Sequence, residues 1–240
     1  MSRDRPGGHD RRMTLETNGT GTGPESSARP RRQSTGARAG WLIPAGLIAL
    51  GFVPVLAGAL RLTELTGGAD VMPANARFAA MPLPVVLHIA AAMLYSVLGA
   101  FQFGRRRRWH RPAGRILIPA GLVVALSGLW MTLFLDRPPG DGDLLAAFRL
   151  VVGTAMAVSL VLGLRSILRR DIARHRAWMT RAYALGMGAG TQAFTQAAWL
   201  AVHDGAQDEV TRALVLGAGW AINLAVAEWV IRRRRARVSA

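Results

Sequence analysis

The sequence predicts an all-α fold: a polytopic membrane bundle of six transmembrane helices with both ends of the chain in the cytoplasm. The first observation is that the apolar residues, 51% of the chain, gather into blocks, each about twenty residues long and so able to cross a bilayer. The second is that every one of the 30 basic residues is an arginine, and that these arginines cluster at the ends of the blocks. Because lipid offers the backbone no hydrogen-bond partners, the blocks are expected to be helices.

The chain begins with residues 1–40, which hold eight arginines among Gly, Ser, Thr and Pro and have no apolar run. Such a segment cannot bury enough surface to become ordered, so it is predicted to be a disordered, Arg-rich cytoplasmic tail. Residues 41–231 form the predicted transmembrane domain, and residues 232–240 a basic cytoplasmic tail. The predicted spans are approximately Trp41–Leu60, Leu83–Gly104, Ala113–Leu135, Leu145–Leu168, Trp178–Leu200 and Ala213–Ile231.

Turn-forming residues separate most of these spans. Gly67-Gly68 follows the first span, Pro82 precedes the second and Pro112 precedes the third. The stretch Pro138–Gly140 divides the third span from the fourth. Proline and glycine interrupt helices, so their positions support the predicted boundaries.

The arginines also predict the orientation of the spans. If the N-terminus is inside, the cytoplasmic segments are 1–40, 105–115, 165–181 and 232–240, and they hold 25 of the 30 arginines. Short cytoplasmic segments of membrane proteins are enriched in this way. We therefore expect a multi-pass protein of the cell membrane with both termini in the cytoplasm.

One alternative concerns the first span. Ala57-Gly58-Ala59 resembles a signal-peptidase site at the end of an apolar stretch. An uncleaved helix is favoured because a long tail precedes it and the apolar stretch has full spanning length. Cleavage would leave five spans in an unchanged orientation.

Composition excludes several classes of function. The chain has no cysteine, which excludes disulfides, thiolate metal sites and covalently attached c-type haem. A net charge of +16 would suggest nucleic acid as the partner of a soluble protein. Here the arginines lie at the ends of spans, so membrane orientation explains them and no nucleic-acid partner is expected.

Polar side chains inside the second predicted span form one candidate site. His88, Tyr95 and Gln102 are separated by seven residues each, so all three lie on one face of a helix. A polar group in lipid is costly and invites a functional interpretation. Interhelical hydrogen bonding is the structural alternative, favoured for Tyr95 and Gln102, whereas a functional role is favoured for His88.

The fifth predicted span carries a second polar face. Arg181, Gln192, Gln196, Trp199 and His203 fall within a narrow arc. This arc is expected to face the interior of the bundle, towards the second span. For His203, an exposed loop histidine is the favoured alternative, since Asp204 follows it directly.

Two histidine-arginine pairs precede spans on the predicted cytoplasmic side. His110-Arg111 comes before the third span and His175-Arg176 before the fifth, and each pair is followed by a further arginine, Arg115 or Arg181. Orientation explains the arginines but does not require two histidines at matching depth. A binding site for an anionic group and an incidental placement both stay open. Glu228 is interpreted as a helical ion pair with Arg232, with a proton carrier as the alternative.

These motifs carry a family resemblance. Leu87-His88, Phe101-Gln102-Phe103, His110-Arg111-x-x-Gly114-Arg115 and His175-Arg176-x-Trp178-Met179-x-Arg181-x-Tyr183 together resemble the bacterial membrane proteins called the domain of unknown function 2306 family, over roughly residues 83–200. The resemblance implies a shared role for His88, His110 and His175. An arginine expected late in the fifth span is replaced here by the region Gly190–Gln192.

The favoured hypothesis is a redox protein that binds haem b or a metal ion. Histidines on facing helices are the usual axial ligands where cysteine is absent. His88, His110 and His175 are the candidate metal ligands, and His203 is a further candidate for haem. The remaining candidates for binding a cofactor, a quinone or anionic lipid head groups are Arg111, Arg115, Arg176, Arg181, Tyr95 and Gln102.

The second hypothesis is a protein without catalytic activity. It would be an accessory or assembly subunit of a membrane complex, acting with a partner or as a homo-oligomer, or a small-solute transporter. The sequence shows no nucleotide-binding loop. It also shows no inverted halves with broken helices, which are typical of many carriers.

Overall fold

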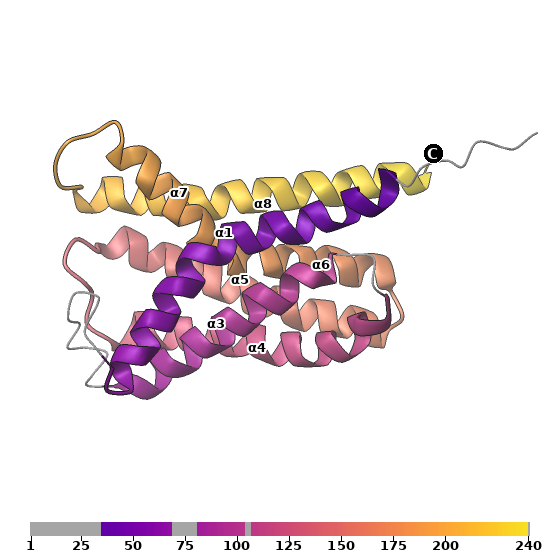
Figure 1. Cartoon of the computed structure of the whole chain (residues 1–240), viewed down its shortest axis with the longest axis horizontal. Helices are drawn as coiled ribbons and strands as arrows, with labels where there is room; N and C mark the ends of the chain where they lie inside the picture. The colour runs from indigo at the N-terminus through magenta and orange to yellow at the C-terminus, as the bar shows by residue number, and fades with distance from the viewer. Residues whose placement is uncertain (1–34, 69–80, 104–106, 240) are drawn as a thin grey trace, which may run out of the picture. The chain divides into compact units, whose positions relative to one another are not determined.

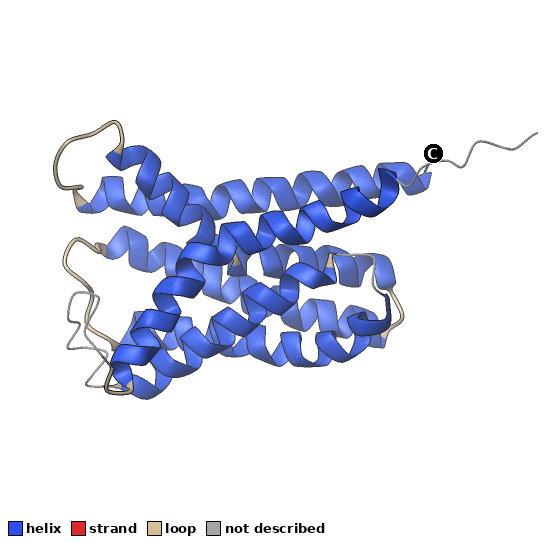
Figure 2. Ribbon diagram, in the orientation of Figure 1, coloured by secondary structure: helices blue, strands red, loops and turns tan. Residues whose placement is uncertain are grey.

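The computed structural model describes residues 35–68, 81–103 and 107–239, and all regular secondary structure in them is helical (Figure 2). Most of the tail that was predicted to be disordered, residues 1–34, lies outside the described residues. The helices in the described ranges are α1 (Thr35–Leu65), α3 (Pro82–Gln102), α4 (Arg107–Phe134), α5 (Asp143–Leu168), α6 (Ile172–Gly186), α7 (Gly188–Leu200) and α8 (Glu209–Ser239).

Five of the described helices are long and apolar enough to cross a membrane, namely α1, α3, α4, α5 and α8. No more than 28% of the residues in the apolar window of each of these helices are buried within the protein. Exposed apolar surface of this extent is unfavourable in water and favourable in lipid. The fold is therefore that of a multi-pass helical membrane protein.

The fifth predicted span is interrupted at Met187. The sequence predicts one continuous span over Trp178–Leu200, and this prediction is wrong in one respect, because α6 ends at Gly186 and α7 begins at Gly188. The backbone tightens there, since the N–H of Gly190 donates to the carbonyl of Met187 at 3.1 Å.

Glycine accounts for the interruption. Gly186, Gly188 and Gly190 lower the local helix propensity, and they admit neighbouring helices that a larger residue would exclude. A Cβ atom at Gly188 would lie 2.0 Å from Nε1 of Trp220, and one at Gly190 would lie 2.4 Å from the carbonyl oxygen of Leu50. Hydropathy does not register this break because all the residues around it are small or apolar.

Successive helices run in opposite directions, except that α7 continues in the general direction of α6, and this arrangement defines two ends of the bundle (Figure 1). Asp141 and Arg212 form an ion pair at 2.7 Å, so α5 and α8 begin at the same end, here called the Asp141 end. The loop between α5 and α6 lies at the opposite end, here called the His175 end. The chain must therefore return to the Asp141 end through α6 and α7.

The core lies between α3, α4, α5 and α6. Tyr95 and Tyr183 are buried at its centre with ring centroids 5.7 Å apart. The hydroxyl of Tyr183 donates to the carbonyl oxygen of Ser96 at 2.8 Å. Gly99 leaves room for this ring, since a Cβ atom at that position would lie 2.2 Å from Cε2 of Tyr183. The packed tyrosines hold the helices that form the walls of the site described next.

Candidate functional site

A cavity of about 310 Å³ lies among α3, α4, α5, α6, α7 and α8. Most of its wall is apolar, and the helix interruption contributes Leu185, Gly186 and Ala189. Concave sites with apolar walls and a few polar groups are the usual form of small-molecule sites. The polar or partly polar side chains that line this cavity are His88, Thr132, Arg149, Gln192 and Trp220.

His88 of α3 is held against α4. Its Nδ1 atom lies 3.0 Å from Oγ of Ser127, and the hydroxyl of Ser127 in turn donates to the carbonyl oxygen of Val123 at 2.5 Å. Gly128 provides space beside the ring, because a Cβ atom there would lie 3.4 Å from Cε1 of His88. His88 therefore lies on the cavity wall, and the functional role that the sequence favours for it stays a prediction.

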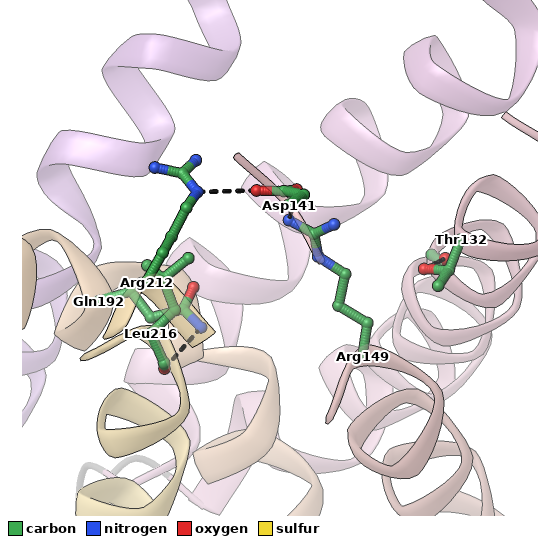
Figure 3. Close-up of polar contacts among 7 residues, drawn as sticks. Thr132, Asp141, Arg149, Gln192, Arg212 and Leu216 are labelled. Carbon is green, nitrogen blue, oxygen red and sulfur yellow. Dashed lines mark hydrogen bonds and ion pairs between the residues drawn. The ribbon is translucent and has the colours of Figure 1, made fainter. Parts of the chain in front are cut away.

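Arg149 belongs to a cluster of one carboxylate and two guanidinium groups (Figure 3). The side chain of Asp141 is 1% exposed and pairs with Nη2 of Arg149 at 2.6 Å and with Nε of Arg212 at 2.7 Å. The three groups together carry one net positive charge. The cluster joins the segment before α5 to the first turns of α5 and α8, and it places a cationic side chain on the cavity.

The two sides of the helix interruption are joined by one side chain of α8. The amide of Asn223 donates to the carbonyl oxygen of Ala184 in α6 at 3.0 Å. The hydroxyl of Thr191 in α7 donates to Oδ1 of Asn223 at 2.6 Å. Broken helices inside a membrane protein need such side-chain partners for their backbone groups.

The polar residues of the fifth predicted span do not form one site, because they make different contacts. Gln192 lines the cavity and donates to the carbonyl oxygen of Leu216 at 3.0 Å (Figure 3). Gln196 instead bonds with Gln207 at 2.8 Å. His203 is exposed and stacks on Trp199, with ring centroids 4.8 Å apart. Only Gln192 of these residues reaches the cavity that His88 lines.

Tyr95 and Gln102 do not line the cavity. Tyr95 is a core residue, 4% exposed, and it packs against Tyr183. Gln102 is the last residue of α3, at the His175 end. A spacing of seven residues places His88, Tyr95 and Gln102 on one face of α3. It also separates them along the helix axis, so they lie at different depths in the bundle.

The predicted residues at the His175 end partly converge. The Nδ1–H of His175 donates to the carbonyl oxygen of Gly163 at 2.9 Å. His110 lies within electrostatic range of His175 and Arg176. Three of the predicted arginines there have exposed side chains, namely Arg111, Arg115 and Arg176.

Arg181 has a structural partner. It forms two hydrogen bonds to Glu228 of α8, at 2.5 and 3.0 Å, and its guanidinium group lies 4.8 Å from the ring centroid of Trp178. The sequence assigned Glu228 to Arg232, and this assignment is corrected, because the bidentate partner comes from a different helix. Spacing along one helix cannot detect such a partner.

The two groups of histidines are far apart. His88 contacts Ser127 near the end of α4, whereas His110 lies near its start, which separates the two by about 25 Å at 1.5 Å per residue. A single metal ion cannot bind both. Within the described ranges, no three His, Asp or Glu side chains are grouped closely enough to hold a metal ion.

Several cavity residues carry no motif in the sequence. Thr132 and Trp220 look like ordinary members of apolar spans, as does Asn223, which joins the two sides of the helix interruption. Arg149 does have a signal, because it is a lone arginine inside the predicted fourth span, and such a residue is a candidate for function.

Comparison with known proteins gives one match. A family model described as "Predicted membrane protein (DUF2306)" matches residues 85–231, which is more than half of the chain. No curated protein and no solved structure matches the chain.

Proposed function

Because the chain belongs to the DUF2306 family of predicted membrane proteins, we propose that it is a six-span protein of the cell membrane that binds a small amphipathic molecule in the cavity beside His88 and Arg149. The cavity carries this proposal. Its volume of about 310 Å³ suits a small molecule, and its wall is largely apolar with one cationic side chain. Such a wall accepts an apolar body and orients a polar or negatively charged head group.

The charge of the cluster at Asp141 favours a ligand with an anionic head group. Arg149 shares Asp141 with Arg212, so the cluster keeps one positive charge. Among the described residues, those that line the cavity include no Asp or Glu. An arginine near lipid is costly, and that cost is offset when a ligand of opposite charge binds beside it.

The relative directions of the helices support six crossings. α5 and α8 begin at the same end, so α6 and α7 together carry the chain back across the bundle. Residues 172–200 are long enough for this, since about 20 helical residues cross a bilayer. An even number of crossings puts both termini on one side, and the 25 arginines of the four segments named above favour the cytoplasm for that side.

Cysteine labelling tests the proposed topology. The chain has no cysteine, so a single substitution gives one reactive site. In intact cells, a membrane-impermeant maleimide should label Ala206→Cys and should label Ala173→Cys only after the membrane is opened. Equal labelling of both variants in intact cells would contradict a sixth crossing through α6 and α7.

Binding of octanoate tests the proposed cavity site. The full chain in detergent should bind octanoate more tightly than octylammonium, because the head group meets a positive cluster. Arg149→Gln should weaken octanoate binding about tenfold, the loss expected for one charge-assisted hydrogen bond. Arg137→Gln is the matched control, since Arg137 pairs with Asp143 at the same end of the bundle and does not line the cavity. Equal affinity in both variants would remove Arg149 from the site.

A redox role at the His175 end is a second candidate. A carbonyl oxygen can only accept, so His175 donates from Nδ1 and its Nε2 keeps a lone pair, the state of a histidine that ligates haem or a metal. His110 lies close by, and the exposed arginines could pair with haem propionates, a quinone or anionic lipid head groups. Visible spectra and metal analysis of the purified protein test this. A Soret band lost in His175→Ala would support it, and a colourless, metal-free protein from haem-replete cells would exclude it.

A further inference from the structure

Three of the polar side chains on the cavity wall, those of His88, Thr132 and Gln192, each donate a hydrogen atom to another group of the protein and keep an acceptor atom. A hydroxyl group carries one hydrogen, and that of Ser127 is donated to the carbonyl oxygen of Val123 at 2.5 Å. Its oxygen must therefore accept from His88, whose Nδ1 lies 3.0 Å away. The neutral imidazole has one N–H, so Nε2 of His88 keeps a lone pair.

Two further residues show the same arrangement. The hydroxyl of Thr132 donates to the carbonyl oxygen of Gly128 at 2.8 Å, so its oxygen can still accept. The amide nitrogen of Gln192 donates to the carbonyl oxygen of Leu216 at 3.0 Å (Figure 3). This bond orients the amide, which presents Oε1 as an acceptor and keeps its second N–H as a donor.

These three acceptors come from different helices and line one cavity. His88 belongs to α3, Thr132 to α4 and Gln192 to α7. Arg149 of α5 supplies a cationic donor on the same wall. These side chains are half-buried in the free protein. A molecule that covered their acceptor atoms without supplying a donor would lose free energy, so a well-bound molecule brings a hydrogen atom of its own.

We infer that the molecule bound in the cavity is a hydroxy acid: its hydroxyl group donates its one hydrogen to one of the acceptors provided by His88, Thr132 and Gln192, while its acidic group lies beside Arg149. This inference rests on the proposed function and narrows its ligand class. An oxidised quinone, whose ring oxygens only accept, and a plain fatty acid both lack the required donor.

Three probes of similar length separate these possibilities: 8-hydroxyoctanoate, 8-methoxyoctanoate and octanoate. Their flexible chains let both ends find their partners. Methylation keeps the oxygen as an acceptor and removes only its hydrogen. For the full chain in detergent, isothermal titration should show 8-hydroxyoctanoate binding about tenfold more tightly than its methyl ether, because one donor to a buried acceptor is lost.

Substitutions of residues that line the cavity test whether these residues cause the preference for the hydroxyl group. The amide of His88→Asn can still donate to Ser127 but has no atom at the position of Nε2, so the preference for the hydroxyl group should fall. Thr132→Val should lower it as well. Thr154→Val is the control, because Thr154 is exposed on α5 and does not line the cavity, and it should keep the full preference.

The outcomes of the titration distinguish this inference from the function on which it rests. If the three probes bind equally well and their binding depends on Arg149, the inferred hydroxy acid is contradicted and the proposed anion-binding site is supported. If no probe binds in a manner that depends on Arg149, both are overturned. The comparison of probes uses the unaltered chain, so it tests the preference for a hydroxyl group even if a variant fails to fold.

Discussion

The side-chain amide of Asn223 donates to the carbonyl oxygen of Ala184 at 3.0 Å, across the gap between α8 and α6. This contact meets a backbone acceptor close to the interruption at Met187. Thr191 on the other side of the interruption donates to the same side chain. Asn223 therefore holds two half-helices in a fixed relation along the cavity wall.

Replacing Asn223 with leucine should destabilise the protein by about 1–3 kcal/mol, because the half-buried carbonyl of Ala184 loses this donor. Thr191→Val removes only the second bond, and the effect should be smaller. Thermal unfolding in detergent measures both. If the two variants unfold at the same temperature as the unaltered chain, the interruption does not depend on Asn223.

Loss of Asp141 should be more costly. Asp141→Asn leaves Arg149 and Arg212 without their counter-charge, and removing one partner of a buried ion pair is strongly destabilising. Both arginines are about a third exposed, so screening reduces the expected loss to about 2–3 kcal/mol. Arg137→Gln breaks a more exposed pair and should cost less than about 1 kcal/mol. A loss of similar size in both variants would show that burial of Asp141 is unimportant.

Small residues at helix contacts give a test of packing. Gly99→Ala should destabilise the fold by about 1–3 kcal/mol, because the added carbon would meet the Tyr183 ring, whose hydroxyl is bonded to Ser96. Gly46→Ala is the control, since no atom lies within 4 Å of a Cβ placed there. That variant should be neutral or slightly stabilising, as expected for alanine in a helix. The opposite order of melting temperatures would refute the packing of α3 on α6.

Asp208 caps the first turn of α8 and makes its stability depend on pH. Hydrogen bonds from the hydroxyl and the backbone N–H of Thr211 lower the pKa of Asp208 below its usual value of 3.8. A lowered pKa means that the cap contributes fully above the unfolded pKa and weakens as the pH falls through the folded pKa.

Asp208→Ala should therefore melt at a lower temperature than the unaltered chain at pH 7, with the difference shrinking towards pH 3. Asp208→Asn should show little pH dependence from this position, because asparagine also caps helices. The comparison is made by thermal unfolding at a series of pH values. A difference between the alanine variant and the unaltered chain that grows on acidification would contradict the capping role.

Much of the fold is readable from the sequence because a lipid solvent leaves a simple pattern. The apolar blocks locate five spanning helices, and His88 stands out as a polar group within one of them. The interruption at Met187 is not readable, since it depends on the close approach of Trp220 to Gly188. The ion pair between Arg149 and Asp141 is also not predictable from the sequence, because only the folded chain brings the segment before α5 beside Arg149.

α8 runs without a break past both candidate regions. Arg212 near its start holds Asp141 beside the cavity, and Glu228 farther along holds Arg181 close to the His175 end. α6 and α7, by contrast, are separated at Met187. A continuous helix transmits a change of tilt along its length, whereas a helix that is interrupted can bend at the interruption. Of the two, α8 is therefore the element that connects the Asp141 cluster with the contact at Arg181 without a break.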